Sequence, residues 1–292
     1  KIDTALLETM SADFAEQLKR VEKEIHSEAG VAFNLNSPQQ LGNVLFEVLE
    51  LPGGRKTAKT KQYSTDVKVL KKLAESHEIA KNILNFRSLA KLKSTYLDAL
   101  IKMVNPKTGR VHTSFNQTGS VTGRFSSSNP NLQNIPIRTE LGRKIRRAFV
   151  AKEGWRLLAA DYSQVELRVL AHISGDPAML AAFARGEDIH ASTAAAIYGV
   201  PLAEVTRDQR RVAKMTNFAI SYGVTGFGLS ERTELSPEEA EVFIQTYFET
   251  YPKIKEYIDR TREQARDQGY VETLLGRRRY FPELRTGARV HR

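Results

Sequence analysis

Residues 156–168 read RLLAADYSQVELR and contain the pattern that decides the fold class of this chain. The apolar run from Arg156 to Ala160 predicts a buried β-strand that ends at the carboxylate of Asp161. Apolar residues then recur at positions 165, 167, 169, 170 and 173, which favours a helix that begins near Ser163. A strand followed by a helix, in a chain whose other patterns are mostly helical, indicates an α+β fold.

Asp161 is a candidate metal ligand, because a carboxylate at a strand end has a fixed backbone and can bind a hard divalent cation through oxygen. Magnesium takes only one or two carboxylates from a protein, so Asp161 and the carbonyl oxygen of Tyr162 could supply a share of its ligands. Two ions about 4 Å apart normally need a second carboxylate. Taken alone, such an aspartate is more often a helix N-cap or a turn former.

The helix pattern over 207–223, RDQRRVAKMTNFAISYG, is more specific. Arg210, Lys214, Phe218 and Tyr222 recur every four residues, so they share roughly a third of the helix surface. The two cations lie near the N-terminal end, where the helix dipole also favours the phosphates of a nucleoside triphosphate. The aromatic rings could pack against sugar and base. The alternative is a solvated basic face with aromatic residues in the core.

Two further side chains have open alternatives. Glu166 lies near the start of its helix, where an acid is favoured by the dipole. In a nucleotide site it would fill the space of a 2′-hydroxyl and exclude ribose by steric clash. His190 could donate to a phosphate or lie satisfied in the core, and its pattern alone favours the core.

Composition limits the classes of function. The chain has 292 residues, a net charge of +10 and no cysteine. The charge favours a polyanionic partner, nucleic acid first, although a merely basic soluble surface is the alternative. The absence of cysteine excludes disulfides, thiolate zinc sites and a cysteine nucleophile, and it fits a reducing compartment. No apolar run approaches the roughly 18 residues of a membrane span. The first residue is Lys1, which indicates a fragment.

The order of the patterns predicts a helical arm, a small sheet platform and a helical lobe. Apolar periodicity predicts helices over 2–25, 39–49, 65–75, 79–101, 207–221, 236–250 and 252–268. Alternation predicts a strand over 110–117, and 276–280 closes a possible hairpin. The loop 52–63 is polar and basic.

The polar stretch 122–136, TGRFSSSNPNLQNIP, holds side chains that can donate to phosphates and to base edges in the minor groove. Asparagine and serine also simply form turns, so each one alone is more often structural. Several lysines of the helical arm suit the tracking of a phosphate backbone, or form a solvated charge run: Lys56, Lys59, Lys61, Lys91 and Lys93.

Together these segments resemble the polymerase domain of a family A DNA polymerase, the bacterial DNA polymerase I type. DYSQVELR resembles motif A and RRVAKMTNFAISYG resembles motif B. TGRFSSSNPNLQNIP resembles the template-primer segment, while LNSPQQL and KLKSTY resemble motifs of the thumb. The five motifs occur in order and cover essentially the whole chain, which makes the resemblance far more specific than any single motif.

The resemblance implies a right-hand architecture with a thumb over residues 1–104, the first half of a palm over 105–166 and fingers over 167–292. It implies DNA synthesis from dNTPs on primer-template DNA, with two Mg²⁺ ions bound by Asp161 and the Tyr162 carbonyl. It also implies a cytoplasmic, nucleoid-associated bacterial protein that is monomeric and binds no membrane.

The resemblance implies roles for matching residues. Arg210, Lys214, His190 and Gln164 would bind the incoming triphosphate, and Lys214 would also donate a proton to pyrophosphate. Glu166 would exclude ribonucleotides, Phe218 would stack by the sugar, and Tyr222 would occupy the template-base position until the fingers close. The remaining residues would bind DNA: Arg124, Asn131, Gln133, Asn134 and Arg138 at the primer and template, and Asn34, Asn36, Ser37, Ser64, Arg87, Lys91 and Lys93 on the thumb.

Two departures from the family pattern stand out. Ala219 occupies a position where the family has glycine, and alanine is the better helix former by about 1 kcal/mol. The family's second catalytic carboxylate lies in a later His-Asp-Glu motif, which this chain does not reach. We therefore expect the palm and fingers to be incomplete and this segment alone to be inactive.

Two alternatives to a DNA polymerase follow from the same residues. A single-subunit RNA polymerase shares the strand-end aspartate and the Arg/Lys helix, but Glu166 and Phe218 argue against it because ribose needs room. A non-catalytic DNA-binding module is the second alternative for this segment.

Overall fold

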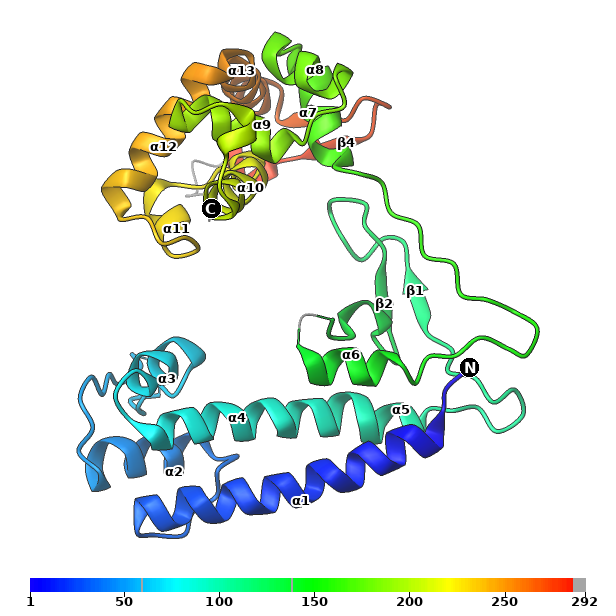
Figure 1. Ribbon diagram of the computed structural model, residues 1–292, viewed down its shortest axis with the longest axis vertical. Coiled ribbons are helices and arrows are strands. Elements are labelled where there is room, and N and C mark those ends of the chain that lie inside the picture. The colour runs from blue at the N-terminus through cyan, green and yellow to red at the C-terminus, as the bar shows by residue number, and fades with distance from the viewer. Residues whose placement is uncertain (59, 138, 286–292) are drawn as a thin grey trace. The chain divides into compact units, whose positions relative to one another are not determined.

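The computed structural model describes residues 1–58, 60–137 and 139–285. It divides into two compact units, Lys1–Leu158 and Ala159–Arg292, which are described separately here (Figure 1). The expected boundaries of thumb, palm and fingers remain a prediction. Among the described residues, no helix is long and apolar enough to cross a membrane.

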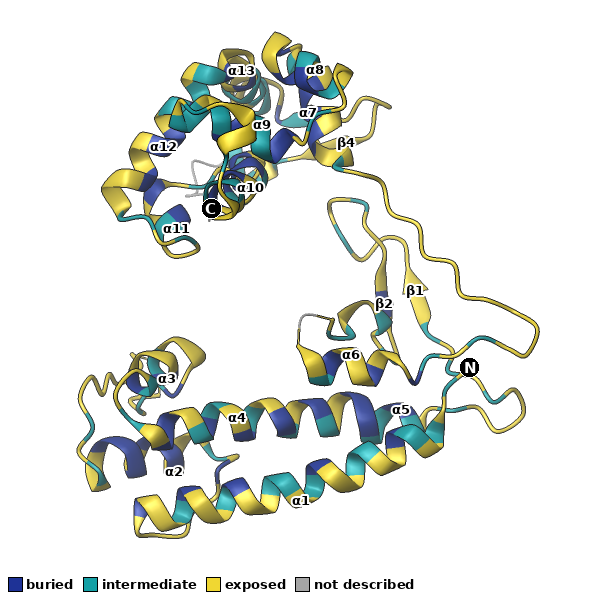
Figure 2. Ribbon diagram, viewed as in Figure 1, coloured by how far each residue is buried: buried dark blue, intermediate teal, exposed yellow. Residues whose placement is uncertain are grey.

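The first unit is built on a pair of long helices, α1 (Thr4–Ala29) and α4 (Glu78–Leu92), which pack along each other. Helix α1 begins where the Asp3 carboxylate accepts a hydrogen bond from the Leu6 amide at 3.0 Å. It ends at Gly30, whose φ of 68° is readily adopted only by glycine. Figure 2 shows buried and exposed residues interleaved along both helices, as expected for helices with one apolar face. The predicted long amphipathic helix is confirmed.

Shorter helices complete this arm. Helix α2 (Pro38–Asn43) continues as a π-helical turn, η1 (Val44–Val48), and α3 (Val67–Ala74) packs against α4. Helix α4 continues as a second π-helical turn, η2 (Lys93–Asp98), into α5 (Ala99–Lys102). The helices predicted over 39–49, 65–75 and 79–101 are thus confirmed, with π turns that apolar periodicity does not reveal.

Two apolar clusters hold the arm together. One joins the C-terminal end of α1 to α2, η1 and α3, and includes Ile25, Leu41 and Leu70, each with no exposed surface. The other joins the N-terminal end of α1 to η2, α5 and α6 (Glu140–Arg146), and includes Leu7 and Ile145. Burial of each such side chain stabilises the fold by roughly 1.5–3 kcal/mol before conformational entropy is subtracted.

The sheet of the first unit is only a hairpin. Strands β1 (Ser114–Asn116) and β2 (Ser126–Ser128) pair antiparallel with Phe115 opposite Ser127. A 3₁₀ turn, η3 (Leu132–Asn134), follows β2. The strand predicted over 110–117 therefore forms, but it is limited to three residues.

The strand predicted over 156–160 does not form. The segment is extended and unpaired within the described residues, and the side chains of Leu157 and Leu158 are 71% and 94% exposed. A strand requires a neighbouring strand for its backbone hydrogen bonds, and none of the described segments provides one. Asp161 therefore follows an exposed extended segment and is not at the tip of a buried strand.

The second unit is a helical lobe. Its helices are α7 (Val165–Ser174), α8 (Pro177–Ala184), α9 (Ile189–Tyr198), α10 (Arg207–Ser221), α11 (Gly226–Ser230), α12 (Pro237–Thr250), α13 (Pro252–Gln268) and α14 (Pro282–Arg285), with a 3₁₀ turn, η4 (Leu202–Glu204), before α10. Strands β3 (Tyr270–Glu272) and β4 (Arg278–Tyr280) form an antiparallel hairpin. The helices predicted over 207–221, 236–250 and 252–268 are confirmed, and so is the hairpin.

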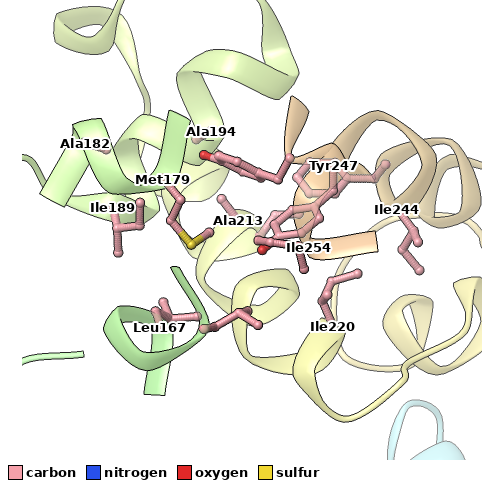
Figure 3. Close-up of a cluster of buried hydrophobic side chains, with 14 of the residues drawn as sticks. Leu167, Met179, Ala182, Ile189, Ala194, Ala213, Ile220, Ile244, Tyr247 and Ile254 are labelled. Atoms are coloured by element: carbon pink, nitrogen blue, oxygen red, sulfur yellow. The ribbon is translucent and has the colours of Figure 1, made fainter. Parts of the chain in front are cut away.

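One apolar cluster forms the core of this lobe. Figure 3 shows side chains from α7, α8, α9, α10, α12 and α13 converging in it, including Leu167, Met179 and Ile189. Tyr247 and Ile254 lie in the same cluster with no exposed surface. Because α9 packs directly against α10 in this core, residues at the starts of the two helices are placed side by side.

Candidate nucleotide-binding site

Helix α10 forms where the sequence predicts it because its N-terminus is capped. Thr206 accepts from the Gln209 amide at 3.2 Å, and the Gln209 side chain accepts from the Thr206 amide at 2.9 Å. This reciprocal pair satisfies two of the amides that a helix leaves unpaired. The helix then buries Val212, Ala213 and Ile220 in the core.

The outer face of α10 is cationic and aromatic, as predicted. Lys214 is exposed and Phe218 is half-buried, while Tyr222, at the C-terminal cap, is 69% exposed. Lys214 makes no ion pair with any residue that the structure describes. This face therefore presents at least one cation and two rings to a ligand.

Arg210 is held by Asp188, the N-cap of α9. One Asp188 oxygen, Oδ1, accepts from the amides of His190 and Ala191 at 2.9 and 3.2 Å. The other, Oδ2, accepts from Arg210 Nε and Nη2 at 2.8 and 2.6 Å. Burial raises the pKa of Asp188, but the hydrogen bonds from Arg210 and from the two amides outweigh it, so that the pKa lies below its ordinary value. Asp188 is therefore ionised at neutral pH.

His190 is buried, with 2% of its surface exposed, which confirms the interpretation of this residue as part of the core. Its Nδ1 lies 3.2 Å from Nδ2, the side-chain nitrogen of Asn217, and its ring centroid lies 5.6 Å from the ring centroid of Phe218. Burial lowers the pKa of His190 to about 4, and the charges of Arg210 and Lys214 add to this effect against that of Asp188. The ring is therefore neutral at pH 7. The binding of a phosphate by this ring stays a prediction.

The residues around Asp161 form a separate group. Asp161 and Tyr162 are exposed, the latter by 82%. Gln164 has a φ of 50° and is the N-cap residue of α7, so the helix predicted to begin near Ser163 begins at Val165. Glu166 is exposed in the first turn of α7. Among the described residues, Asp161 makes no hydrogen bond or ion pair to α9 or α10.

The donors near Asp161 are compatible with a share of a magnesium site. One carboxylate and one backbone carbonyl are hard oxygen ligands, and magnesium commonly takes only one or two carboxylates from a protein. Within residues 1–58, 60–137 and 139–285, no three histidine, aspartate or glutamate side chains are grouped as metal ligands. The binding of magnesium by Asp161 and the Tyr162 carbonyl therefore stays a prediction.

In the first unit, several predicted DNA-binding residues also have local structural roles. Ser37 caps α2 and Asn131 caps η3. The Asn34 side chain accepts from the Asn36 amide at 2.9 Å. Ser64 donates to Asp66 at 2.8 Å, and Gln133 donates to the Phe125 carbonyl at 3.0 Å. The structural alternative is thus realised for these residues, which is compatible with a second role in binding DNA.

The basic residues of this set differ in exposure. Arg87 donates to Thr65 Oγ1 at 3.1 Å and is half-buried, and burial lowers its pKa. Lys93 donates to Asp98 at 2.8 Å within η2. Lys91 and Arg124 are exposed. Asn134, a polar member of the same predicted set, accepts a hydrogen bond from the Tyr96 hydroxyl through its backbone oxygen at 2.6 Å. Arg138 lies outside the described residues.

Sequence reasoning missed two groups around His190. One is Asp188, which lies two residues before His190 in the chain and binds Arg210. Asn217, Thr193 and Tyr251 were not singled out, although all three are buried and connected to the ring of His190. The available signal was a polar side chain on the apolar face of a helix, since buried polar groups need partners.

Comparison with known proteins identifies the family to which this chain belongs. Residues 4–292 match the model of DNA polymerase family A, and the chain belongs to this family. The resemblance seen in the motifs and the α+β polymerase fold are thereby confirmed.

Individual relatives are bacterial DNA polymerases I. The chain is 52% identical over 284 residues to the thermostable DNA polymerase I of Thermus aquaticus, covering 97% of this chain and 34% of that protein. It is 53% identical over 285 residues to DNA polymerase I of Geobacillus stearothermophilus, covering 97% and 32%. The chain thus spans about a third of the length of these curated relatives.

A solved structure agrees over nearly the whole chain. It is the POL domain of Pol1 from M. smegmatis in complex with DNA primer-template and dNTP. The match has a TM-score of 0.88 and 42% sequence identity, and it covers 99% of this chain and 51% of that one.

Proposed function

We propose that the protein carries out template-directed DNA synthesis, in which dNTPs are added to the 3′-hydroxyl of a primer and pyrophosphate is released. Membership of family A and the similarity to proteins named DNA polymerase I support this proposal. The structural observation that carries it is the outer face of α10, where Arg210, Lys214 and Phe218 are presented beside the neutral ring of His190.

The charges on this face suit a triphosphate. Lys214 is exposed, so its ammonium group can approach the phosphate oxygens, and it is the candidate proton donor to the departing pyrophosphate. Arg210 uses Nε and Nη2 to bind one Asp188 oxygen, which leaves Nη1 to contact a phosphate. Both lie in the N-terminal half of α10, where the helix dipole adds positive potential.

Asp161 and the Tyr162 carbonyl would hold magnesium in this reaction. When bound, two such ions would activate the 3′-oxygen and neutralise the leaving group. Asp161 is exposed, so its carboxylate is accessible to a cation and to the phosphates of a nucleotide.

Sugar and base of the nucleotide would be recognised by side chains of α7 and α10. We propose that Glu166, in the first turn of α7, occupies the space that a 2′-hydroxyl needs, with Gln164 beside it. Phe218 would pack against the sugar, and the exposed ring of Tyr222 would leave its place when the template base enters. The polar residues of the first unit would position primer and template through backbone contacts.

Replacing Glu166 tests the assignment of sugar choice. In the full-length protein, Glu166→Ala should raise incorporation of ribonucleotides relative to deoxynucleotides, because the 2′-hydroxyl then has room. The matched control is Glu166→Gln, which keeps the volume, removes the charge and should retain the discrimination. Primer extension with dNTP or rNTP gives the ratio of kcat/KM. An unchanged ratio in Glu166→Ala would contradict the steric role.

Replacing Asp161 separates a polymerase from a DNA-binding module. Asp161→Asn keeps the size of the side chain but weakens the hold on a divalent cation. Loss of metal stabilisation worth several kcal/mol should slow primer extension by at least about a hundredfold. DNA binding, measured by fluorescence anisotropy, should stay within a factor of two or so. If extension continued at full rate, Asp161 would have no catalytic role.

A further inference from the structure

A chain of buried polar side chains runs behind the outer face of α10. It connects His190 and Thr193 of α9, Asn217 of α10 and Tyr251 between α12 and α13. All four are at most 2% exposed. Asn217 Nδ2 lies 3.2 Å from His190 Nδ1 and 3.1 Å from Thr193 Oγ1, and Thr193 Oγ1 lies 3.1 Å from the Tyr251 hydroxyl. None of these residues except His190 has a role in the proposed function.

The direction of these hydrogen bonds follows from counting protons. Thr193 has one hydroxyl proton, and the shortest contact of its oxygen is with the Ile189 carbonyl at 2.8 Å, one helical turn earlier. Its proton therefore goes to that carbonyl, and its oxygen accepts from Asn217 and from Tyr251. Asn217 Nδ2 lies 3.1 Å from Thr193 Oγ1 and Asn217 Oδ1 lies farther away, at 3.4 Å, so the NH₂ group is the closer partner and donates to Thr193.

The same amide then determines the state of the histidine. An amide NH₂ has two protons, and the second points at His190 Nδ1. Nδ1 must therefore accept, and because a neutral imidazole carries one proton, that proton lies on Nε2. The opposite orientation of Asn217 would turn its oxygen to Nδ1 and place the proton there instead.

The charged groups that face the ring shift its pKa in opposite directions, and the net result is a neutral ring. Asp188 lies at the start of the same helix, and Arg210 and Lys214 lie on α10. Burial, to which Arg210 and Lys214 add and which Asp188 opposes, lowers the pKa of the ring to about 4, so the ring is neutral at pH 7 and its one proton lies on either Nδ1 or Nε2. Phe218 of α10 and Tyr251 on the far side of Thr193 carry no charge there.

We propose that Asn217 is a positioning residue for the nucleotide, which fixes His190 as the Nε2–H tautomer so that the ring offers a donor to a phosphate oxygen. The inference rests on the proposed function, because it needs a triphosphate beside His190. An N–H group attracts an anionic oxygen, whereas the lone pair of an unprotonated Nε2 repels it. The tautomer thus decides whether the same ring assists or hinders binding.

The tautomer can be read directly from the chain labelled with ¹⁵N-histidine. The resonances of the ring are assigned by their loss in His190→Gln. At about pH 7 the spectrum should show a proton on Nε2 and a bare Nδ1. A proton on Nδ1 in the unmodified chain would overturn the proposal without any variant being needed.

Two variants separate tautomer control from a general structural role. Asn217→Leu removes both donors at similar volume, and the ring should then populate both tautomers. Asn217→Ala, which adds no atoms, replaces it if the leucine variant does not fold. Tyr251→Phe breaks the same buried network beyond Thr193, away from Asn217 and the ring, so it should lose stability but retain the Nε2–H tautomer. If Asn217→Leu or Asn217→Ala kept that tautomer, Asn217 would not control it.

The consequence for binding is measured by primer extension with the full-length protein. Loss of one charge-assisted hydrogen bond should raise the KM for dNTP about tenfold in Asn217→Leu. Tyr251→Phe should change it by less than about threefold, and Asn217→Leu should add little in a His190→Gln background. An equal rise in both single variants would mean that the network is only structural. If the unmodified protein extended no primer at all, the proposed function would fail, while the tautomer result would stand by itself.

Discussion

Acidification should destabilise the second unit through His190. Only 2% of the surface of this residue is exposed. Its pKa in the folded protein is about 4, whereas the ordinary value for histidine is 6.5. Below pH 6.5 the unfolded chain takes up a proton that the folded chain does not. The contribution of neutral His190 to the free energy of unfolding is therefore fully present above about pH 6.5. It is lost as the pH falls from there towards 4.

The size of this loss follows from the two pKa values. Between about pH 7.5 and about pH 5, a shift from 6.5 to about 4 lowers the free energy of unfolding by about 2 kcal/mol. Carboxylates such as Asp188, whose pKa is lowered, stay ionised over this range. Their contribution to the free energy of unfolding is lost only at lower pH. The loss between pH 7.5 and 5 should thus depend on His190 more than on its anionic neighbours.

A comparison with His190→Gln isolates the effect, because glutamine does not titrate. Urea unfolding of both chains at the two pH values would be followed through the methyl resonance of Met179, which has no exposed surface and reports on the second unit alone. The unmodified chain should lose about 2 kcal/mol more than the variant between the two conditions. Equal losses in the two proteins would refute the reasoning, and so would a larger loss in His190→Gln.

Three other substitutions have defined outcomes for stability, all measurable by the same unfolding experiment. Tyr247→Phe should raise the free energy of unfolding by about 1 kcal/mol, because the Tyr247 hydroxyl is buried without a hydrogen-bond partner among the described residues; a decrease would indicate an unseen partner. Asp188→Asn should lower the free energy of unfolding by less than about 1 kcal/mol, since asparagine keeps the N-cap of α9 and only a partly exposed ion pair is lost. Asp188→Ala should lower it by about 1 kcal/mol more, because the cap is lost as well. Equal losses in the two variants would mean that the cap contributes nothing. Ala219→Gly should destabilise α10 by about 1 kcal/mol and speed amide exchange in that helix; unchanged exchange rates would show that the methyl group is not needed.

Most helices could be predicted from the sequence, because a helix closes its hydrogen bonds within its own segment. The pattern over 207–221 and the capping pair of Thr206 and Gln209 are both local, and the observed bounds of α10 agree with the prediction. The cationic and aromatic face of this helix also follows from spacing alone. The family motifs could be recognised for the same reason, since each is a short continuous run of residues.

The remaining features depend on partners that are distant in sequence. The run 156–160 has the composition of a strand, but a strand exists only where another segment pairs with it, and none of the described segments does. Asp188 and Arg210 are 22 residues apart, and only the packing of α9 against α10 makes them an ion pair. The same packing buries His190 against Asn217.

Sequence by itself therefore determined most of the longer helices, which face of α10 carries charge, and the family to which the chain belongs. Tertiary structure alone decided that the segment before Asp161 is unpaired, that Arg210 is shared with Asp188, and that His190 is neutral with a buried amide at its Nδ1. The physical reason is that helical periodicity is a local property. Burial, pKa and hydrogen-bond partners instead depend on which distant groups exclude water from the same place.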